Sequence, residues 1–347
     1  MQNEVIILGI ESSCDDTSAA LFRNGKILAN ITAGQKIHEL YGGVVPELAS
    51  RNHQQNIVPV IDTTLKKAGI VPAQISAIAF TRGPGLIGSL LVGSSFAKSM
   101  ALALNVPLIE VNHMQGHILA HFIEAGDGSS DLEKMNDPIH PKFPFLCLTV
   151  SGGHTQIVKA KDYLDHELLG QTTDDAVGEA FDKAAKILGL SYPGGPLIDK
   201  YARGGDLSRY KFPRTRMEGF NYSFSGIKTA FLNFINNSIQ KDPDFVKKNM
   251  NDICASYQAH LISVLLEKLE EAADFHHIKE IAIAGGVSAN SGLRKAIKEL
   301  GDKKGWSVYI PPFEYCTDNA AMIAQAGYYK YLRGEFAGMN TSPSARM

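Results

Sequence analysis

The sequence has few cysteines and no clear excess of charge of either sign. Its four cysteines, Cys14, Cys147, Cys254 and Cys316, lie far apart and form no Cys-x-x-Cys pair. This spacing argues against a disulfide framework and against a thiolate zinc site. Lys and Arg total 34 and Asp and Glu total 36, which gives a net charge of -2. No global positive field is available to attract nucleic acid or anionic lipid, so any such contact must come from a local patch.

The chain also lacks a long uncharged apolar run. Lys98 and Pro107 interrupt its richest apolar region, so no stretch approaches the roughly 18 residues that a membrane-spanning helix needs. The first residues lack the basic segment and the long apolar segment of a signal peptide, and residues 5–10 are typical of a strand instead. We therefore expect a cytoplasmic protein without membrane contact.

The size and composition of the chain predict a two-lobed globular enzyme. With 347 residues, it exceeds what one hydrophobic core usually organises. Hydrophobic residues make up 44% and charged residues 20% of the chain, which is ordinary for a packed soluble protein and unlike a disordered one.

Two similar groups of strands suggest that the chain contains two related halves. The first group comprises residues 5–10, 18–22 and 26–31, with Asn24-Gly25 as a type I′ hairpin turn. The second comprises residues 145–150 and 155–160 and a third strand near Leu168. Each half places a short polar or glycine-rich loop between its first two strands. Two such loops facing each other would form a cleft.

Helices and short buried strands alternate through the rest of the chain. Helices are expected at residues 47–68, 87–104, 174–188, 252–274 and 290–300, and strands at 75–80, 281–284 and 308–310. The class is therefore α/β, with additional helices in the second lobe. The polar, Pro-containing stretch 125–142 is the best candidate for a surface insertion or linker. It would separate an N-terminal lobe (1–124) from a C-terminal lobe (143–347), whose last helix could pack back on the first lobe.

The clearest chemical signal is a pair of histidines, His113 and His117, four residues apart. On a helix this spacing puts both imidazoles on one face, close enough to share a metal ion. The glutamate that follows the first histidine in His-Glu-x-x-His metalloproteases is absent, so protease chemistry is disfavoured. Asp318, just before an alanine-rich helix, is the most plausible third ligand. Alternatively, the histidines are ordinary buried helix residues and Asp318 is a helix N-cap.

Four loops have the composition of phosphate or nucleotide sites. They span residues 9–17, 151–155, 193–196 and 285–290. The first carries hydroxyls together with Asp15 and Asp16, which could hold a cation or accept a proton. The glycines of the others permit close backbone approach to an anion, and Asp182 and Asp199, on either side of the third, could meet ribose hydroxyls. Each loop could equally be a solvated turn.

Together these loops resemble the fold shared by actin, sugar kinases and heat-shock ATPases (ASKHA), in which two duplicated lobes clasp a nucleotide. Longer motifs resemble more closely those of the TsaD family of threonylcarbamoyltransferases. They are GIESSCDDT at 9–17, GGVVPELASRxH at 42–53, TRGPGLxGSL at 81–90, NHMxGH at 112–117, VSGGHT at 150–155, GEAFDK at 178–183, SFSGIKT at 223–229 and GGVxAN at 285–290. The motifs run nearly end to end in the order typical of that family.

The resemblance implies transfer of the threonylcarbamoyl group from threonylcarbamoyl-AMP to the exocyclic amine of adenosine 37 in tRNAs that read codons beginning with A. It implies one divalent metal per subunit, Fe²⁺ or alternatively Zn²⁺, held by His113, His117 and Asp318. Asp15 matches the acidic loop residue near the reacting group and is our candidate catalytic base. The implied substrate-binding residues are Thr149, Val150, Ser151, Gly152, Gly153, Asp182, Gly195, Asp199 and Asn290.

The same resemblance implies tRNA as substrate and protein partners similar to TsaB and TsaE. One local segment could contribute to the RNA contact, with a solvated loop as the alternative. It contains Lys211, Phe212, Arg214, Arg216, Phe220 and Tyr222. The nearest competing function is an ATPase or phosphotransferase of the same fold. Such an enzyme would hold Mg²⁺ through carboxylates and water and would not need two imidazoles.

Overall fold

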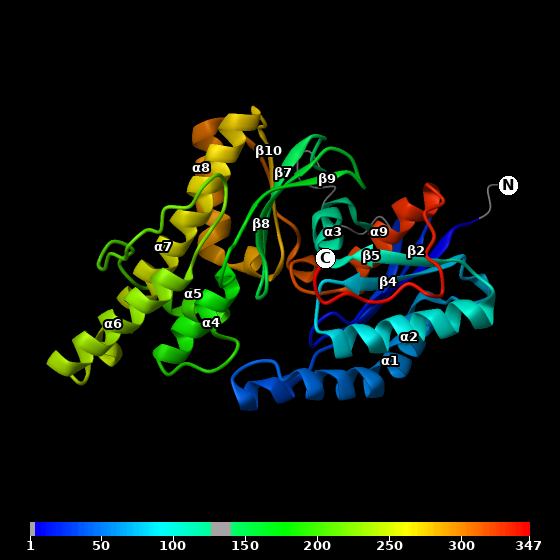
Figure 1. The fold of residues 1–347 in the computed structure, drawn as a ribbon, viewed down its shortest axis with the longest axis horizontal. Helices are drawn as coiled ribbons and strands as arrows, with labels where there is room; N and C mark the ends of the chain where they lie inside the picture. The colour runs from blue at the N-terminus through cyan, green and yellow to red at the C-terminus, as the bar shows by residue number, and fades with distance from the viewer. Residues whose placement is uncertain (1–3, 126–139) are drawn as a thin grey trace. The chain divides into compact units, whose positions relative to one another are not determined.

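The computed structural model describes residues 4–125 and 140–347, which form two units. Unit 1 comprises Met1–His140, Tyr163–Asp165 and Pro312–Met347, and unit 2 comprises Pro141–Asp162 and His166–Pro311. Each unit is built on one β-sheet (Figure 1). Most of the stretch 125–142, which the sequence marks as an insertion, lies outside the described residues.

The sheet of unit 1 has the order β5-β4-β1-β2-β3-β6. Its strands are β1 (Ile6–Glu11), β2 (Thr17–Arg23), β3 (Lys26–Ala33), β4 (Ala77–Gly83), β5 (Leu108–Asn112) and β6 (Glu124–Ala125). The first three form the expected antiparallel meander, while β4 pairs parallel with β1 and β5 parallel with β4. The turn between β2 and β3 has positive φ at Asn24 and Gly25, which confirms the type I′ hairpin.

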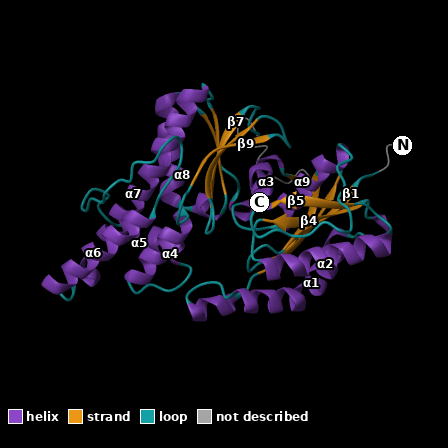
Figure 2. Ribbon diagram, in the orientation of Figure 1, coloured by secondary structure: helices purple, strands orange, loops and turns teal. Residues whose placement is uncertain are grey.

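Helices cover both faces of this sheet (Figure 2). They are α1 (Pro46–Ala68), α2 (Ile87–Leu104), α3 (His113–Leu119) and α9 (Ala320–Leu332), with the short 3-10 helices η1 (Lys36–Tyr41), η2 (Pro72–Gln74), η3 (Ala120–Phe122) and η6 (Phe313–Tyr315). Side chains alternate along β1. Leu8 and Ile10 join the core cluster shared with α1 and α2, while Gly9 lies against the backbone of α9 on the opposite face.

Helix α2 is long and apolar enough to cross a membrane, judged by its length and composition alone. One such helix is weak evidence, since core helices of soluble proteins pass the same test. One face of α2 packs on unit 1, where Leu90, Ala97 and Ala101 are buried. In the structure the helix is therefore a layer of this unit, although only 33% of its 18 residues are buried.

The sheet of unit 2 repeats the arrangement of the first. Its order is β11-β10-β7-β8-β9, with strands β7 (Phe145–Val150), β8 (Thr155–Ala160), β9 (His166–Gln171), β10 (Glu280–Ala284) and β11 (Ser307–Tyr309). Strands β7 to β9 form an antiparallel meander, and β10 pairs parallel with β7 as β4 does with β1. The repeated topology is the one expected of two related halves.

The helices of unit 2 depart from the expectation at several points. They are α4 (Val177–Ile187), α5 (Gly194–Ala202), α6 (Ser225–Lys241), α7 (Phe245–His276) and α8 (Ser291–Lys304), with the 3-10 helix η5 (Gly286–Ala289). Helices α5 and α6 were not predicted from the sequence. Helix α4 begins three residues later than predicted, because the carboxylate of Asp174 instead accepts hydrogen bonds from Ser223 Oγ and from the backbone N–H of Phe224 at the start of α6.

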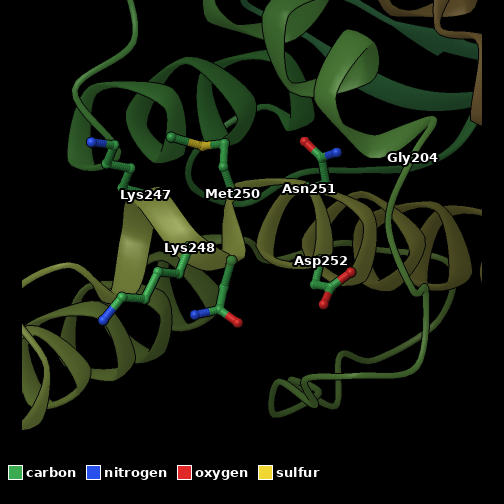
Figure 3. Close-up of a pocket in the computed structure, with 7 residues that line it drawn as sticks. Gly204, Lys247, Lys248, Met250, Asn251 and Asp252 are labelled. Carbon is green, nitrogen blue, oxygen red and sulfur yellow. The ribbon is translucent and has the colours of Figure 1, made fainter.

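Helix α7 begins earlier than the predicted residue 252 because it continues through a kink. Asn249 has non-helical backbone angles there, with φ -120° and ψ 15°. A hollow of about 320 Å³ opens at the kink, lined by Gly204 and residues 247–252 (Figure 3). None of the predicted site residues lines this hollow.

The segment proposed for RNA contact is only partly available. Phe212 and Tyr222 are 8% and 1% exposed and belong to the hydrophobic core of unit 2. Arg214 forms an ion pair with Glu267 of α7. Phe212 and Tyr222 therefore cannot contribute to the RNA contact expected of this segment, because their rings are enclosed by the protein.

Candidate functional site

The histidine pair lies at the start of α3, directly after β5. The Asn112 side-chain oxygen accepts hydrogen bonds from the backbone N–H groups of Met114 and Gln115, at 2.9 and 3.1 Å, which fixes where the helix begins. His113 and His117 then project from one face, one turn apart, with ring centroids 4.7 Å apart. Both are buried, at 6% and 0% exposure.

Asp318 reaches the same place from the other end of the chain. The N-cap of α9 is Asn319, whose side-chain oxygen accepts the Met322 N–H at 3.0 Å, so the alternative of Asp318 as the cap is wrong. Its carboxylate oxygen Oδ1 lies 3.3 Å from His113 Nε2 and 3.2 Å from His117 Nε2. The structure therefore brings all three predicted ligands together within unit 1.

These three residues fit a metal ion. One potential ligand atom from each lies within 4.8 Å of the other two, and two imidazole nitrogens with one carboxylate oxygen suit zinc or iron. His117 Nδ1 is buried and has no hydrogen-bond partner within the described part of the chain. The nitrogens that face the cluster, His113 Nε2 and His117 Nε2, both lie beside the Asp318 carboxylate, so all three groups are placed to share one ion.

Burial and opposite charges act against each other in this cluster. Burial alone would raise the pKa of Asp318, but the neighbouring His113 and His117 hold that pKa well below its usual range. Burial would lower the pKa of His113, but the carboxylates of Asp318 and Glu11 raise it well above its usual value. Burial lowers the pKa of His117. A metal ion bound here would displace the proton from His113.

A buried carboxylate, Glu11 at the end of β1, lies behind His113. It is 0% exposed and its Oε2 is 3.1 Å from His113 Nδ1. Ser13 Oγ lies 3.2 Å from the same nitrogen. Neither residue was predicted as part of the site, because only the tertiary fold brings β1 beside α3. The available signal was a glutamate closing an otherwise apolar buried strand.

The loop that carries Asp15 and Asp16 borders this cluster and is held at both ends by His53 of α1. His53 Nε2 donates to the Cys14 carbonyl at 3.0 Å, and its Nδ1 lies 2.7 Å from Thr17 Oγ1. Since Nε2 must donate, the neutral ring accepts the Thr17 hydroxyl at Nδ1. Burial, followed by the charges of Asp15, Asp318 and Glu11, raises the pKa of Asp16 to about 7.

The raised pKa of Asp16 gives a pH-dependent stability. In the unfolded chain this carboxyl titrates near 3.8, so between pH 4 and 7 the folded metal-free protein binds more protons and its stability falls as pH rises. Asp16→Asn removes this loss, while Asp15, Asp318 and Glu11 stay in place. Urea unfolding of the chelated proteins at pH 4.5 and 8 should show the wild type losing about 2–4 kcal/mol relative to the variant. Equal changes in both proteins would contradict the assignment.

In unit 2, residues 149–153 continue from the end of β7 into a loop. Thr149 and Val150 are buried within the strand, whereas Gly152 and Gly153 are exposed and have open space where a side chain would be. The Gly178 N–H at the start of α4 donates to the Ser151 carbonyl at 3.2 Å. Only the loop, and not the Thr149 and Val150 side chains, can approach a ligand directly.

Of the other predicted residues of unit 2, Asp182 lies within α4 and Asp199 within α5, whereas Gly195 and Asn290 lie at the starts of α5 and α8. Asp182 Oδ1 accepts the N–H groups of Gly194 and Gly195 at 2.8 and 3.2 Å, at the start of α5, and burial raises the pKa of this carboxyl. Asp199 Oδ1 accepts from Ser291 Oγ at 2.7 Å. Asn290 is the N-cap of α8 and also donates to Gln258 Oε1 at 2.7 Å.

Contacts between strands bring these groups into one region of unit 2. A Cβ on Gly285, just after β10, would lie 2.4 Å from the Val150 carbonyl at the end of β7, and the two strands run parallel. The carboxyl ends of adjacent parallel strands, with helix N-termini beside them, form the usual ligand-binding edge of an α/β sheet.

The family model and two similar proteins that match this chain carry the same name. Residues 26–325 match the family TsaD, tRNA N6-adenosine threonylcarbamoyltransferase. A protein of that name from Christiangramia forsetii is 61% identical over 343 residues, covering 99% of this chain and 98% of the relative. Another from Riemerella anatipestifer is 60% identical, covering 98% of this chain and 97% of the relative.

Solved structures support the fold. HypF from T. kodakarensis has a TM-score of 0.61 at 16% identity, covering 96% of this chain and 48% of that chain. Component A of the (R)-2-hydroxyglutaryl-CoA dehydratase of Acidaminococcus fermentans has a TM-score of 0.53 at 14% identity, covering 95% of this chain and 98% of that chain. Such low identities show similarity of fold alone. They confirm the prediction of an α/β protein with two lobes of the actin-like ASKHA fold.

Proposed function

Because the chain belongs to the TsaD family of tRNA N6-adenosine threonylcarbamoyltransferases, we propose that it transfers the threonylcarbamoyl group of threonylcarbamoyl-AMP to the exocyclic amine of adenosine 37 in tRNA. The family resemblance drawn from the sequence motifs is confirmed. The observation that best supports the proposed chemistry is the convergence of His113, His117 and Asp318 on one point. A phosphotransferase would not need this ligand set.

The proposed donor is a mixed anhydride and is already activated. The protein must therefore orient the donor and stabilise charge, rather than generate a strong electrophile. Negative charge develops first on the attacked carbonyl oxygen and then on the phosphate of the departing AMP. A divalent ion bound at the cluster supplies Lewis-acid stabilisation of such charge.

We assign His113, His117 and Asp318 as the protein ligands of that ion, with Fe²⁺ as the proposed metal and Zn²⁺ as the alternative. The donor set accommodates both metals. Three protein ligands leave coordination positions open, as catalytic sites require. His117 is 0% exposed and His113 6% exposed, so their positions are fixed by packing as well as by the Asp318 carboxylate.

We assign donor binding to the strand-end edge of unit 2. The backbone of Ser151, Gly152 and Gly153 can approach the phosphate closely because no side chain intervenes at the glycines. The Thr149 and Val150 side chains are buried, so these two residues contribute by shaping the loop. The remaining residues proposed to surround the nucleoside are Asp182, Gly195, Asp199 and Asn290.

Asp15 remains our candidate for proton removal from the attacking amine. The amine of adenine is weakly basic, so positioning contributes more to the rate than the strength of the base. Asp15 is partly exposed in a loop whose flanking residues are held by His53. A fixed loop with an accessible carboxylate suits contact with a substrate that arrives from solvent.

The proposed partners are tRNA and proteins resembling TsaB and TsaE, and the proposed compartment is the cytoplasm. The anticodon loop presents unpaired bases, so adenosine 37 can be reached without opening a duplex. The net charge of -2 means that tRNA binding cannot depend on bulk attraction. Partner proteins that share the contact with tRNA would meet this need.

Two variants separate the proposed roles. In single-turnover transfer from threonylcarbamoyl-AMP to unmodified tRNA, with the partner proteins present, we expect Asp15→Ala to lower the rate about 100-fold at saturating donor. We expect Asp199→Ala mainly to raise the donor concentration needed for half-maximal rate, because that carboxylate is assigned to donor binding. Near-normal transfer by Asp15→Ala would remove its assignment. Absence of any transfer by the wild type would remove the proposed reaction.

A further inference from the structure

Glu11 is a fully buried carboxylate with no role in the chemistry described so far. It ends β1 at 0% exposure, and within the described residues no Lys or Arg side chain forms an ion pair with it. Its polar partners are the Ser13 backbone N–H, the Thr81 hydroxyl at 2.6 Å and His113 Nδ1 at 3.1 Å. A buried carboxylate without a cationic Lys or Arg partner costs several kcal/mol, so its presence calls for a compensating function.

The hydrogen bonds determine which nitrogen of His113 keeps its proton when a metal ion displaces the other one. Glu11 Oε1 accepts the Ser13 N–H, and Oε2 is shared by the Thr81 hydroxyl and His113 Nδ1. An acceptor-only carboxylate in this position requires a proton on His113 Nδ1. The opposite nitrogen, Nε2, is the one that lies 3.3 Å from Asp318 Oδ1. The two edges of one ring therefore face a carboxylate on one side and the ligand cluster on the other.

We propose that Glu11 is a positioning residue that fixes the orientation and tautomer of His113, so that the Nε2 lone pair is directed at the metal position. Metal-binding histidines commonly donate their second ring N–H to a carboxylate, which orients the ring and makes the ligand more basic. This inference rests on the metal site in the proposed function. His117 has no comparable support, since its Nδ1 lacks a hydrogen-bond partner among the described residues. His113 is thus the ligand oriented by hydrogen bonding.

A purely structural role for Glu11 makes a different prediction. The carboxylate also ties the Ser13 turn to Thr81. A glutamine oxygen in place of Oε1 could still accept the Ser13 N–H, while an amide nitrogen in place of Oε2 would donate to the Thr81 hydroxyl, which can turn its own proton to the Ile10 carbonyl 3.5 Å away. The same amide nitrogen would also face His113 Nδ1 and donate to it. The ring would then carry its proton on Nε2 and lose the lone pair that a metal needs. Glu11→Gln therefore keeps the Ser13 link, reverses the hydrogen bond with Thr81 and inverts the His113 tautomer.

The test is metal affinity, measured on the chelated full-length protein by competition between the protein and a chromophoric chelator for Zn²⁺, and for Fe²⁺ under anaerobic conditions. We expect Glu11→Gln to lower the association constant about 10- to 100-fold, with thermal unfolding of the metal-free protein little changed. The matched control is Thr81→Val, which removes a donor to the same carboxylate without facing His113. We expect its affinity to stay within a few-fold of the wild type.

Glu11→Gln that binds metal as tightly as the wild type would overturn the inference and leave the proposed transfer reaction intact. A wild type that binds neither ion would overturn this inference and the metal site together. Should the glutamine variant fail to fold, nitrogen-15 NMR of the zinc-loaded wild type decides the question. We expect the His113 ring to show a slowly exchanging proton on Nδ1 and none on Nε2, and the reverse pattern would overturn the inference.

Discussion

Replacing His117 by alanine is expected to abolish stoichiometric metal binding and to lower the rate of threonylcarbamoyl transfer at least about 100-fold. His117 is 0% exposed and its Nε2 lies 3.2 Å from Asp318 Oδ1, so no other described side chain of the cluster can replace it as the third ligand. The measurements are bound metal per chain and single-turnover transfer to unmodified tRNA. Near-normal transfer by the metal-free variant would contradict the account.

A matched control exists in the same unit. His38 is also buried, at 1% exposure, and its Nε2 is hydrogen-bonded to Gln35 Oε1 at 2.9 Å. It is not part of the metal cluster. His38→Ala therefore removes a buried imidazole from unit 1 and should leave the metal content unchanged. A comparable loss of metal in His38→Ala would mean that His117→Ala acts by general destabilisation.

Replacing Gly9 by alanine is expected to be among the most destabilising of the conservative changes in unit 1. A Cβ at this position would lie 2.7 Å from the Ala320 carbonyl oxygen and 2.7 Å from the Ala324 nitrogen. Both are backbone atoms of α9, which cannot rotate away as a flexible side chain could. Overpacking of this kind costs about 1–3 kcal/mol and more where backbone must move, so we expect about 3 kcal/mol or more.

The same substitution should weaken metal binding, because α9 must shift and Asp318 is only two residues before it. Gly286→Ala is the matched control, since no atom of residues 4–125 and 140–347 outside its own neighbours lies within 4 Å of its Cβ position. Urea unfolding and zinc affinity of both variants test the prediction. Unfolding of Gly9→Ala at the wild-type urea concentration would contradict the close packing of β1 against α9.

Local patterns predicted most of the strands and the first helices, although they missed β5 and the short β6. Apolar runs, the Asn24-Gly25 turn and the glycine after α1 are signals carried by neighbouring residues, and Gly69 does adopt the left-handed conformation that ends the helix. By contrast, α5 was missed because its Pro193-Gly194-Gly195-Pro196 start is typical of a turn. The helix begins there because Asp182, from a different helix, accepts the N–H groups of both glycines.

In the candidate site, too, local sequence patterns predicted some residues, whereas others are brought together only by tertiary packing. The spacing of His113 and His117 predicts a shared helix face, but the position of Asp318 depends on the packing of α9 against β1 and α3. The sequence supplied Asp318 through a motif and a family resemblance rather than through geometry. Glu11 and His53 were not predicted as part of the site because each contacts a residue of another element. Glu11 contacts His113, and His53 contacts the loop that carries Asp15.

The most direct test of the account is anomalous diffraction from crystals of the active wild-type protein, recorded at the iron and zinc absorption edges. The account predicts one ion bonded by both imidazoles and by the Asp318 carboxylate, with His113 coordinating through Nε2. Crystals of fully active protein with no ion between these three side chains would contradict it.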